Sequence, residues 1–374
     1  MSKEVRISQG KHTTLRGDGS HFYFCVLRAA CCVLLSAFTA CQTANDATSR
    51  ARSEGNKGTL SRYDQYFSAA MPAEGKVWAV GQNGKIVVSH DRGQTWSAQV
   101  SNTNQSLLSV SFPEASRGWA VGVAGTILHT ADGGTTWAMQ NSGTEKDLLA
   151  VQFLDPQHGW VIGAAGVMLF TQDGGQHWQD RSLNADANLN HLYFLDAQTG
   201  WVVGEYGTVM KTTNGGETWE QVAGQIPDTG DEGKSWEELM SAKDVGAGGV
   251  STATRGGLGE EDNLFAVYFA DANHGWATST GGRVFLTEDG GAQWQPKETG
   301  YEAPLFAVGA ACQTCPLYTC GGRGLLLRSS DGGNTWSEVK LAERAYSYLR
   351  DLVFLGPQEL LLIGTQGTLL RAGV

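Results

Sequence analysis

Residues Gly118–Trp137 read GWAVGVAGTILHTADGGTTW and decide the fold. Two short apolar runs flank a Gly-x-x-Gly turn, and the stretch closes with the eight-residue phrase TADGGTTW, Thr130–Trp137. Short alternating runs bounded by Gly, Asp and Asn are typical of antiparallel strands joined by tight turns. The stretch therefore predicts a β-hairpin followed by an Asp-containing turn.

The eight-residue phrase occurs six times along the chain. Its copies are Ser89–Trp96, Thr130–Trp137, Thr171–Trp178, Thr212–Trp219, Thr287–Trp294 and Ser329–Trp336. The first four closing tryptophans, Trp96 to Trp219, follow one another at intervals of 41 residues. A period of about 40 residues with four predicted strands per unit is typical of a β-propeller blade.

Counting the units gives seven blades within residues 55–374. The seventh unit, Leu349–Arg371, has its first three strands, and a shift by one period places Gly55–Arg62 where its fourth strand should be. We therefore predict an all-β, seven-bladed β-propeller of four-stranded antiparallel blades. Its ring is closed by the N-terminal strand, which removes free sheet edges.

The carboxylate that recurs in the phrase is predicted to be structural. Asp or Asn at the third place can accept hydrogen bonds from the turn's own amides, and the glycine at the fifth place permits a positive φ. Asn214 replaces Asp without breaking the pattern, which hydrogen bonding allows and acid catalysis does not. The structural Asp-box residues are Asp91, Asp132, Asp173, Asn214, Asp289 and Asp331.

The N-terminus has the features of a secretory leader. Arg28 precedes the apolar run Ala29–Ala40, which is too short to span a bilayer. Phe38–Cys41 resembles a bacterial lipobox, in which Cys41 would be acylated. We expect a lipoprotein signal peptide over residues 1–40, a flexible tether over 41–54 and the propeller over 55–374. Cleavage without lipidation is the alternative.

The net charge and the residue after the lipobox cysteine bear on the partners and the cellular location of the protein. A net charge of −11 argues against nonspecific nucleic-acid binding, which needs a basic surface. We expect a monomer without a cofactor, tethered on the extracytoplasmic, periplasmic side of a membrane. Gln42 after the lipobox cysteine resembles the pattern of outer-membrane lipoproteins.

Through the unit G-W-x-V-G…T-x-D-G-G-x-T-W, clearest in Gly118–Trp137 and Gly200–Trp219, the chain resembles the photosystem II stability/assembly factor family over residues 56–374. The resemblance implies a seven-bladed propeller that holds a nascent membrane subunit during assembly, on the thylakoid lumen side in a photosynthetic host. Similar sequences also occur in non-photosynthetic bacteria, and the members that work on the photosystem are associated with an arginine patch on the propeller. The arginines on blades five to seven form either a basic sector or solvated strand ends; they are Arg283, Arg323, Arg328, Arg344, Arg350 and Arg371.

One interval breaks the period, since Trp294 follows Trp219 by 75 residues. An insertion therefore falls near residues 226–262, on the rim of the Gly-x-x-Gly turns and opposite the Asp-boxes. Ser235–Met240 within it resembles a capped helical turn. The insertion is either a lid packed on the propeller or a partner-docking element. Candidate partner-binding residues on this rim are Trp236, Leu239, Met240, Tyr206, Arg283, Arg323 and Arg350.

Three cysteines lie close together in the sixth unit. Cys312 and Cys315 occupy its first turn, and Cys320 lies on the strand that follows. In an oxidising compartment a disulfide within this trio is expected, with Cys312 and Cys315 as the candidate pair. Unpaired cysteines and a metal or redox site are the alternatives.

Asp-box propellers include sialidases, so a sialidase-like enzyme or a glycan-binding module is the competing class. Sialidases need an arginine triad, a tyrosine nucleophile with a glutamate partner, and an acid. Blades one to three offer Arg92, Arg117 and Arg181, and none of these is predicted near a central pocket. We therefore predict a non-enzymatic propeller whose partner is a membrane protein or complex.

Overall fold

The computed structural model describes residues 60–73, 75–183, 185–224, 255–259, 261–341 and 347–373. All of them belong to one unit of the chain, Asn56–Val374. The predicted signal peptide, the tether and most of the insertion lie outside the described residues, and so do Cys41, Trp236, Leu239 and Met240. Among the residues that the structure describes, no helix is long and apolar enough to cross a membrane.

The first four blades are antiparallel sheets of four strands each. Blade one holds β1 (Tyr66–Ala73), β2 (Lys76–Gly81), β3 (Ile86–Ser89) and β4 (Ser97–Gln99). Blade two holds β5 (Leu107–Ser111), β6 (Gly118–Gly122), β7 (Ile127–Thr130) and β8 (Ala138–Gln140). Blade three holds β9 (Leu148–Phe153), β10 (Gly159–Gly163), β11 (Met168–Thr171) and β12 (Gln179–Asp180). Blade four holds β13 (Leu189–Phe194), β14 (Gly200–Gly204), β15 (Val209–Thr212) and β16 (Glu220–Ala223).

Three further blades complete the ring. Blade five holds β17 (Leu264–Phe269), β18 (Gly275–Ser279), β19 (Arg283–Thr287) and β20 (Gln295–Glu298). Blade six holds β21 (Leu305–Ala310), β22 (Leu317–Gly321), β23 (Leu326–Ser329) and β24 (Ser337–Glu338). Blade seven holds β25 (Leu349–Gly356), β26 (Glu359–Gly364) and β27 (Leu369–Gly373). Short 3-10 turns are η2 (Gln82–Gly84), η3 (Ala164–Gly166), η4 (Arg255–Gly257), η5 (Thr280–Gly282) and η6 (Gly322–Gly324).

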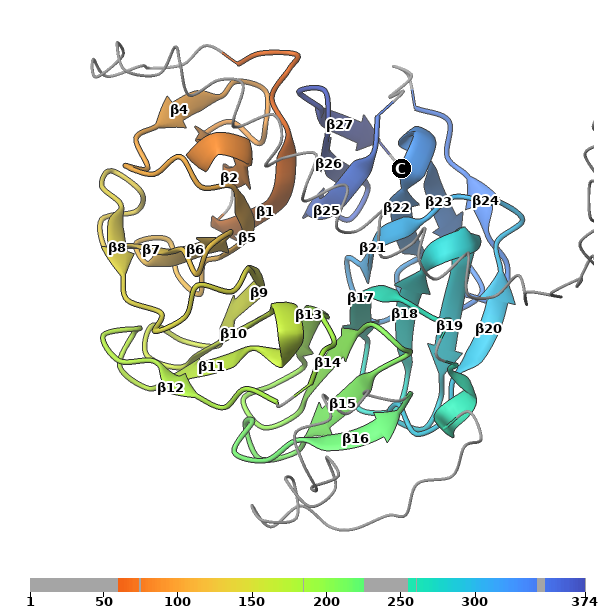
Figure 1. Cartoon of the computed structure of the whole chain (residues 1–374). Coiled ribbons are helices and arrows are strands. Elements are labelled where there is room, and N and C mark those ends of the chain that lie inside the picture. The colour runs from red at the N-terminus through yellow and green to blue at the C-terminus, as the bar shows by residue number, and fades with distance from the viewer. Residues whose placement is uncertain are drawn as a thin grey trace, which may run out of the picture. The chain divides into compact units, whose positions relative to one another are not determined.

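The predicted seven-bladed propeller is confirmed. The first strand of each blade is innermost, and each innermost strand contacts those of the two neighbouring blades, with β1 between β25 and β5. Figure 1 shows the sheets around one centre, with the orange first blade beside the blue last blade. Within the described residues, six sheets have four strands and the seventh has three.

Tryptophans on the second strands hold neighbouring blades together. Trp119 is fully buried and stacks on Phe153 of the next blade, with ring centroids 3.5 Å apart. Its indole Nε1 donates to the carbonyl of Gly174 in the Asp-box of that blade, at 3.2 Å. Trp201 makes the equivalent bond to Gly290 at 2.9 Å. Trp160 and Trp276 make the same bond, whereas the Nε1 of Trp78 has no hydrogen-bond partner within the described residues, so apolar burial is what all five indoles share.

The chain enters blade one from the side of blade seven. The amide of Gly367, in the β26–β27 turn, donates to the carbonyl of Asp64 at 2.6 Å. The same bond joins Gly125 to Lys146 at 2.9 Å, where Lys146 lies in the connection from blade two to blade three. Asp64 therefore occupies the position, relative to blade seven, that Lys146 of the connection between blades two and three occupies relative to blade two. Of the predicted closing strand, residues 55–59 are not described and 60–62 form no strand, so a fourth strand in blade seven stays a prediction.

Side chains of blades one and seven also pack directly against each other. Tyr66, Val77 and Val87 of blade one form an apolar cluster with Leu361 and Ile363 of blade seven. In the part of the chain that is described, the ring closes through this cluster and through polar contacts across the same boundary.

Candidate protein-binding rim

The turns of the propeller fall on two opposite rims. The turns between second and third strands lie with the connections between blades, as the bond from Gly125 to Lys146 shows. We call this the connection rim. The Asp-boxes lie with the turns between first and second strands, since the amide of Gly133 donates to the carbonyl of Ser116 at 2.7 Å. We call this the Asp-box rim. The base of the insertion lies on the connection rim, because the amide of Gly207 donates to the carbonyl of Asp262 at 2.6 Å.

Each Asp-box carboxylate is occupied by its own turn. In blade two, Asp132 accepts from the Thr136 amide at 2.9 Å, from the Thr136 hydroxyl at 2.7 Å and from the Thr130 hydroxyl at 2.9 Å. The bonds from Thr136, that of the amide foremost, lower the pKa of Asp132 to about 2. A carboxylate held this way stays ionised at neutral pH and has no proton to deliver, so the arrangement suits a turn rather than an acid catalyst.

Asn214 in blade four makes the same turn with an amide. Its Oδ1 accepts from the Thr218 amide at 3.0 Å and from the Thr212 hydroxyl at 2.9 Å. Its Nδ2 donates to the Thr218 hydroxyl at 2.9 Å, where Asp132 accepts from Thr136. The turn is therefore kept when the direction of the hydrogen bond between the third residue of the phrase and the threonine hydroxyl is reversed.

The three arginines weighed for a sialidase triad are engaged elsewhere. Arg92 donates to the Leu355 carbonyl at 2.7 Å and pairs with Glu359 at 3.1 Å, joining blades one and seven. Arg117 pairs with Glu114 in the β5–β6 turn of the Asp-box rim. Arg181 follows the outer strand β12 and lies over the ring of Phe170. None of them belongs to a shared carboxylate site.

Two of the candidate partner-binding residues are held by the propeller itself. Arg283, at the start of β19, pairs at 2.9 Å with Asp262, whose side chain is 3% exposed. This ion pair fastens the described end of the insertion to blade five. Tyr206 lies in the β14–β15 turn with φ at 58° and packs, half-buried, against the apolar cluster between blades three and four. Arg283 and Tyr206 therefore stabilise the propeller, in addition to lying on the connection rim.

Arg350 lies at the centre of an aromatic cluster on the inner strands. Its guanidinium lies 4.6 Å from the ring centroid of Phe306 in blade six and 5.9 Å from that of Phe67 in blade one. Phe306 in turn contacts Phe265 of blade five at 5.2 Å and Tyr348 at 6.1 Å between centroids. We call these five residues the aromatic–arginine cluster. It joins four consecutive blades, and Tyr348 is 47% exposed.

Two exposed arginines lie on turns next to blade seven. Arg323 is exposed at the tip of η6, which packs against β25, and it forms no ion pair among the described residues. Arg62 is exposed beside the β26–β27 turn and donates to the Tyr63 hydroxyl at 2.8 Å. The structure thus places Arg323 and Arg350 in one sector of the connection rim, while Arg283 and Tyr206 lie on blades four and five. A cation–aromatic surface of this kind suits an extended peptide with acidic and apolar side chains.

The aromatic members of the cluster were missed by sequence reasoning, although the repeat carries a signal for them. Each inner strand begins with a buried residue followed by a half-buried one. The half-buried residues, taken blade by blade, are Phe67, Leu108, Leu149, Asn190, Phe265, Phe306 and Arg350. Aligning the repeats on this position brings out three phenylalanines and an arginine in blades five, six, seven and one.

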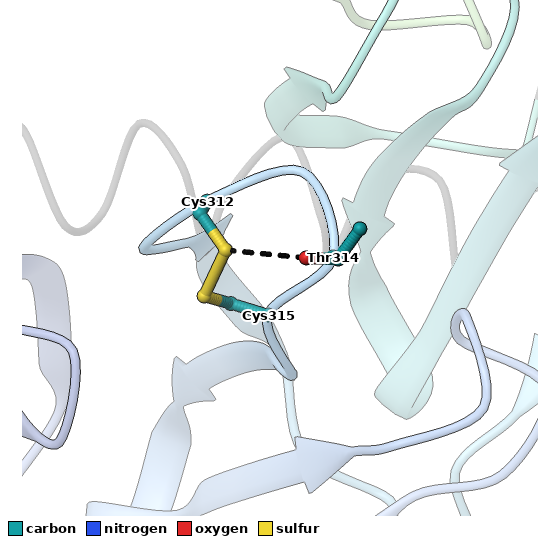
Figure 2. The surroundings of a disulfide bond; sticks show 3 residues. All are labelled: Cys312, Thr314 and Cys315. Atoms are coloured by element: carbon teal, nitrogen blue, oxygen red, sulfur yellow. Dashed lines mark hydrogen bonds between the residues drawn. A yellow bond between two sulfur atoms is a disulfide. The ribbon is translucent and has the colours of Figure 1, made fainter.

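The cysteine trio of blade six is divided by the fold. Cys312 and Cys315 form a disulfide in the β21–β22 turn on the Asp-box rim (Figure 2). Cys320 is buried on β22 as a free thiol, and burial raises its pKa well above the ordinary value. Within the described residues, no group of three or more His, Cys, Asp or Glu side chains is arranged to hold a metal ion.

Sequence comparison finds the same repeat in known proteins. The family model described as "Photosynthesis system II assembly factor YCF48" matches residues 135–229 and 306–373, and that of the BNR/Asp-box repeat matches residues 87–98. The photosystem II assembly protein Ycf48 of Synechococcus sp. (strain JA-3-3Ab) is 31% identical over 106 residues, 28% of this chain and 32% of that protein. The photosystem II assembly lipoprotein Ycf48 of Nostoc sp. (strain PCC 7120) is 30% identical over 99 residues, 26% of this chain and 29% of that protein. The matched region spans about a third of the length of these curated relatives.

Solved structures share the fold over nearly the whole propeller. YCF48 bound to a D1 peptide superposes with a TM-score of 0.62 at 20% identity, covering 83% of this chain and 94% of that one. YCF48 from Cyanidioschyzon merolae gives 0.64 at 18% identity, with coverages of 85% and 97%. A GH74 xyloglucanase from Xanthomonas campestris gives 0.60 at 13% identity, covering 82% of this chain and 52% of the enzyme. The chain is therefore a seven-bladed β-propeller with BNR/Asp-box repeats, and part of its sequence is similar to photosystem II assembly factors.

Proposed function

We propose that the protein is a non-enzymatic propeller that holds a segment of a membrane protein while a membrane complex is assembled or kept stable. The observation that carries this proposal is the aromatic–arginine cluster on the connection rim, in a chain whose relatives are named photosystem II assembly proteins. A structural neighbour, YCF48, binds a D1 peptide, and a peptide segment of a membrane subunit is the partner class that we propose here.

The chemistry of the cluster supports a peptide over a small substrate. Its aromatic rings are spread over four blades, so the surface is extended rather than gathered into one catalytic point. The guanidinium of Arg350 lies over the rings of Phe306 and Phe67, so its positive charge is part of the aromatic surface. Arg323 adds a second cation nearby.

The insertion is the second part of the proposed site. Trp236, Leu239 and Met240 remain proposed partner-binding residues within residues 225–254. The described end of the insertion is anchored to blade five, where the Trp294 amide donates to the Gly256 carbonyl at 2.6 Å and Asp262 pairs with Arg283. A deletion that tests the insertion should therefore remove residues 226–254 and keep Arg255–Asp262.

We also propose that Cys41 is acylated and that the propeller is tethered on the extracytoplasmic side, at the outer membrane or, in a photosynthetic host, facing the thylakoid lumen. The lipobox-like Phe38–Cys41 and the relative in Nostoc named a lipoprotein support this proposal. Cys41→Ser should move the protein from the membrane fraction to the soluble fraction. If the wild-type protein is itself soluble after cell lysis, the proposed tether is wrong.

The proposed function is tested by crosslinking and affinity capture of the full chain from its own host. The wild type should recover a membrane protein. Arg323→Ala/Arg350→Ala and the 226–254 deletion should each recover at least tenfold less of it, whereas Arg117→Ala on the opposite rim should recover the same amount. Equal recovery by all variants would overturn the proposed site. A glycan array and a sialoside hydrolysis assay test the competing class, a glycan-binding module or a sialidase-like enzyme. Binding of a glycan or hydrolysis of the sialoside would contradict the proposed function.

A further inference from the structure

The Cys312–Cys315 disulfide lies in an exposed turn outside the core. The two cysteines are three positions apart in sequence, and their turn links β21 to β22 on the Asp-box rim (Figure 2). Cys312 is exposed and Cys315 is half-buried. A thiolate approaching from solvent can therefore reach the disulfide without any opening of the propeller.

The turn is held by other bonds as well. The Cys315 amide donates to the Cys312 carbonyl at 3.0 Å. The Gln313 side-chain amide donates to the carbonyl of Ala270 in blade five at 2.8 Å. Opening the disulfide leaves both bonds in place, so the reduced turn stays fastened to the neighbouring blade.

Blades three and five close the corresponding turn without a covalent bond. In blade three Asp155 accepts from His158 Nδ1 at 2.8 Å, and in blade five Asp271 contacts His274 Nδ1 at 2.9 Å, again three residues apart. In blades three and five, an Asp–His hydrogen bond thus spans the turn that the disulfide spans in blade six. A disulfide across so few residues also removes little entropy from the unfolded chain, because the stabilisation grows with the length of the closed loop.

Thr314 gives the pair an asymmetry. Its hydroxyl oxygen lies 3.6 Å from Cys312 Sγ, within hydrogen-bonding reach of sulfur (Figure 2). A hydroxyl that donates to a sulfur stabilises the thiolate more than the thiol, and a stabilised thiolate is the better leaving group in disulfide exchange. Cys312 is the more exposed cysteine of the pair. The Thr314 hydroxyl also favours the departure of Cys312 as a thiolate once Cys312 is bound in a mixed disulfide.

We propose that Cys312–Cys315 is a thiol–disulfide exchange site that accepts two electrons from a protein dithiol. One thiolate of the reductant attacks Cys312 Sγ, the bond to Cys315 Sγ breaks, and Cys315 leaves as a thiolate that takes up a proton. The second thiolate of the reductant then attacks its own sulfur in the mixed disulfide. Cys312 leaves and is protonated, and the reductant departs as a disulfide. The site lies on the rim opposite the proposed partner surface and is independent of that function.

Cys320 provides an internal control for the test. It is buried on β22 and lies with Cys312 and Cys315 in one tryptic peptide, Glu298–Arg323. In the full-length protein, dithiothreitol serves as the dithiol probe under native conditions. Exposed thiols are then alkylated with one isotope of iodoacetamide, and the other isotope follows after unfolding. Mass spectrometry of the peptide reports each cysteine separately.

The proposal predicts that Cys312 and Cys315 take the first isotope together within minutes while Cys320 takes the second. The circular dichroism spectrum and the tryptophan fluorescence should stay unchanged. Cys312→Ala should trap Cys315 as a thiol and abolish paired labelling. Thr314→Val should raise the pH midpoint of Cys312 alkylation in the reduced protein, whereas loss of a merely structural hydroxyl would leave that midpoint unchanged.

Two results would overturn the proposal. One is labelling of Cys312 and Cys315 that requires unfolding, with the same denaturant dependence as Cys320. The other is a Cys312→Ala/Cys315→Ala variant whose melting temperature falls as far as that of a core variant such as Trp119→Ala, since the disulfide would then be a structural staple.

Discussion

The Asp351 carboxylate accepts a hydrogen bond of 3.0 Å from the backbone amide of Ala69, across the boundary between the last blade and the first. Equivalent bonds join other inner strands, since the Val151 amide donates to the Ser109 hydroxyl at 3.2 Å and the Val267 amide to His191 Nδ1 at 3.4 Å. Asp351 and His191 are thus titratable members of a set of bonds between blades, and we expect the stability of the ring to depend on pH through both of them.

Asp351 should make the propeller more stable in mild acid. Burial raises its pKa from 3.8 to about 6, so the folded state binds this proton more tightly than the unfolded state. Its contribution is present in full below pH 3.8 and is lost as the pH rises through 6. At about 1.36 kcal/mol per pKa unit, the loss is on the order of 2–3 kcal/mol. Asp351→Asn keeps an acceptor for Ala69 and should remove this dependence. Urea unfolding at pH 4.5 and pH 7 measures it, and identical pH profiles of wild type and variant would exclude the effect.

His191 should act in the opposite direction over the same pH range. Burial lowers its pKa from 6.5 to about 4, so its contribution is present above pH 6.5 and is lost as the pH falls through 4. His191→Gln should therefore be less sensitive to acid than the wild type. The same unfolding series measures this effect. A variant that loses stability in acid as steeply as the wild type would show that His191 does not titrate with unfolding.

Trp119→Ala should destabilise the propeller by about 3–5 kcal/mol, because it removes a fully buried indole and its bond to Gly174. Trp178, which closes the Asp-box of blade three and is half-buried, provides the matched control. Trp178→Ala should cost clearly less. Chemical denaturation of both variants compares them, and equal losses would contradict the assignment of the second-strand tryptophans as the main contacts between blades.

The Asp-box should tolerate an amide better than an apolar residue. Asp132→Asn should retain most of the wild-type melting temperature, since Asn214 makes the same turn with an amide. Asp132→Ala should lower the melting temperature, because the Thr136 amide loses its acceptor. Thermal unfolding followed by circular dichroism compares the two. A loss for Asp132→Asn equal to that for Asp132→Ala would show that the charge, rather than the acceptor, holds the turn.

Arg283→Met should destabilise the protein by on the order of 3 kcal/mol, because it leaves the buried Asp262 carboxylate without its counter-ion. Asp262→Asn should cost less, since an amide is cheaper to bury and the remaining arginine is 28% exposed. Both are measured by denaturant unfolding at pH 7. If the aspartate variant proves the more damaging, the ion pair is not what fastens the end of the insertion.

Most of the fold could be predicted from the sequence, because the blade repeats its chemistry at fixed intervals. The phrase ending in Trp96, Trp137, Trp178 and Trp219 gave the period, and the second-strand tryptophans gave the register. The site was harder to predict, since it depends on contacts between repeats. Arg283 reads as a free rim cation, yet its partner Asp262 comes from the end of the insertion. Arg350 was found, but its aromatic neighbours Phe67 and Phe306 come from other blades.

Photocrosslinking from the connection rim tests the partner-binding surface most directly. A benzophenone amino acid at Tyr348, in the aromatic–arginine cluster, is compared in the host with the same group at Met139, which is 64% exposed on the outer strand of blade two. We predict a covalent adduct to one membrane protein from position 348, absent from position 139 and reduced at least tenfold by Arg323→Ala/Arg350→Ala. Equal adducts from both positions, or no membrane protein from position 348, would contradict a peptide-binding connection rim.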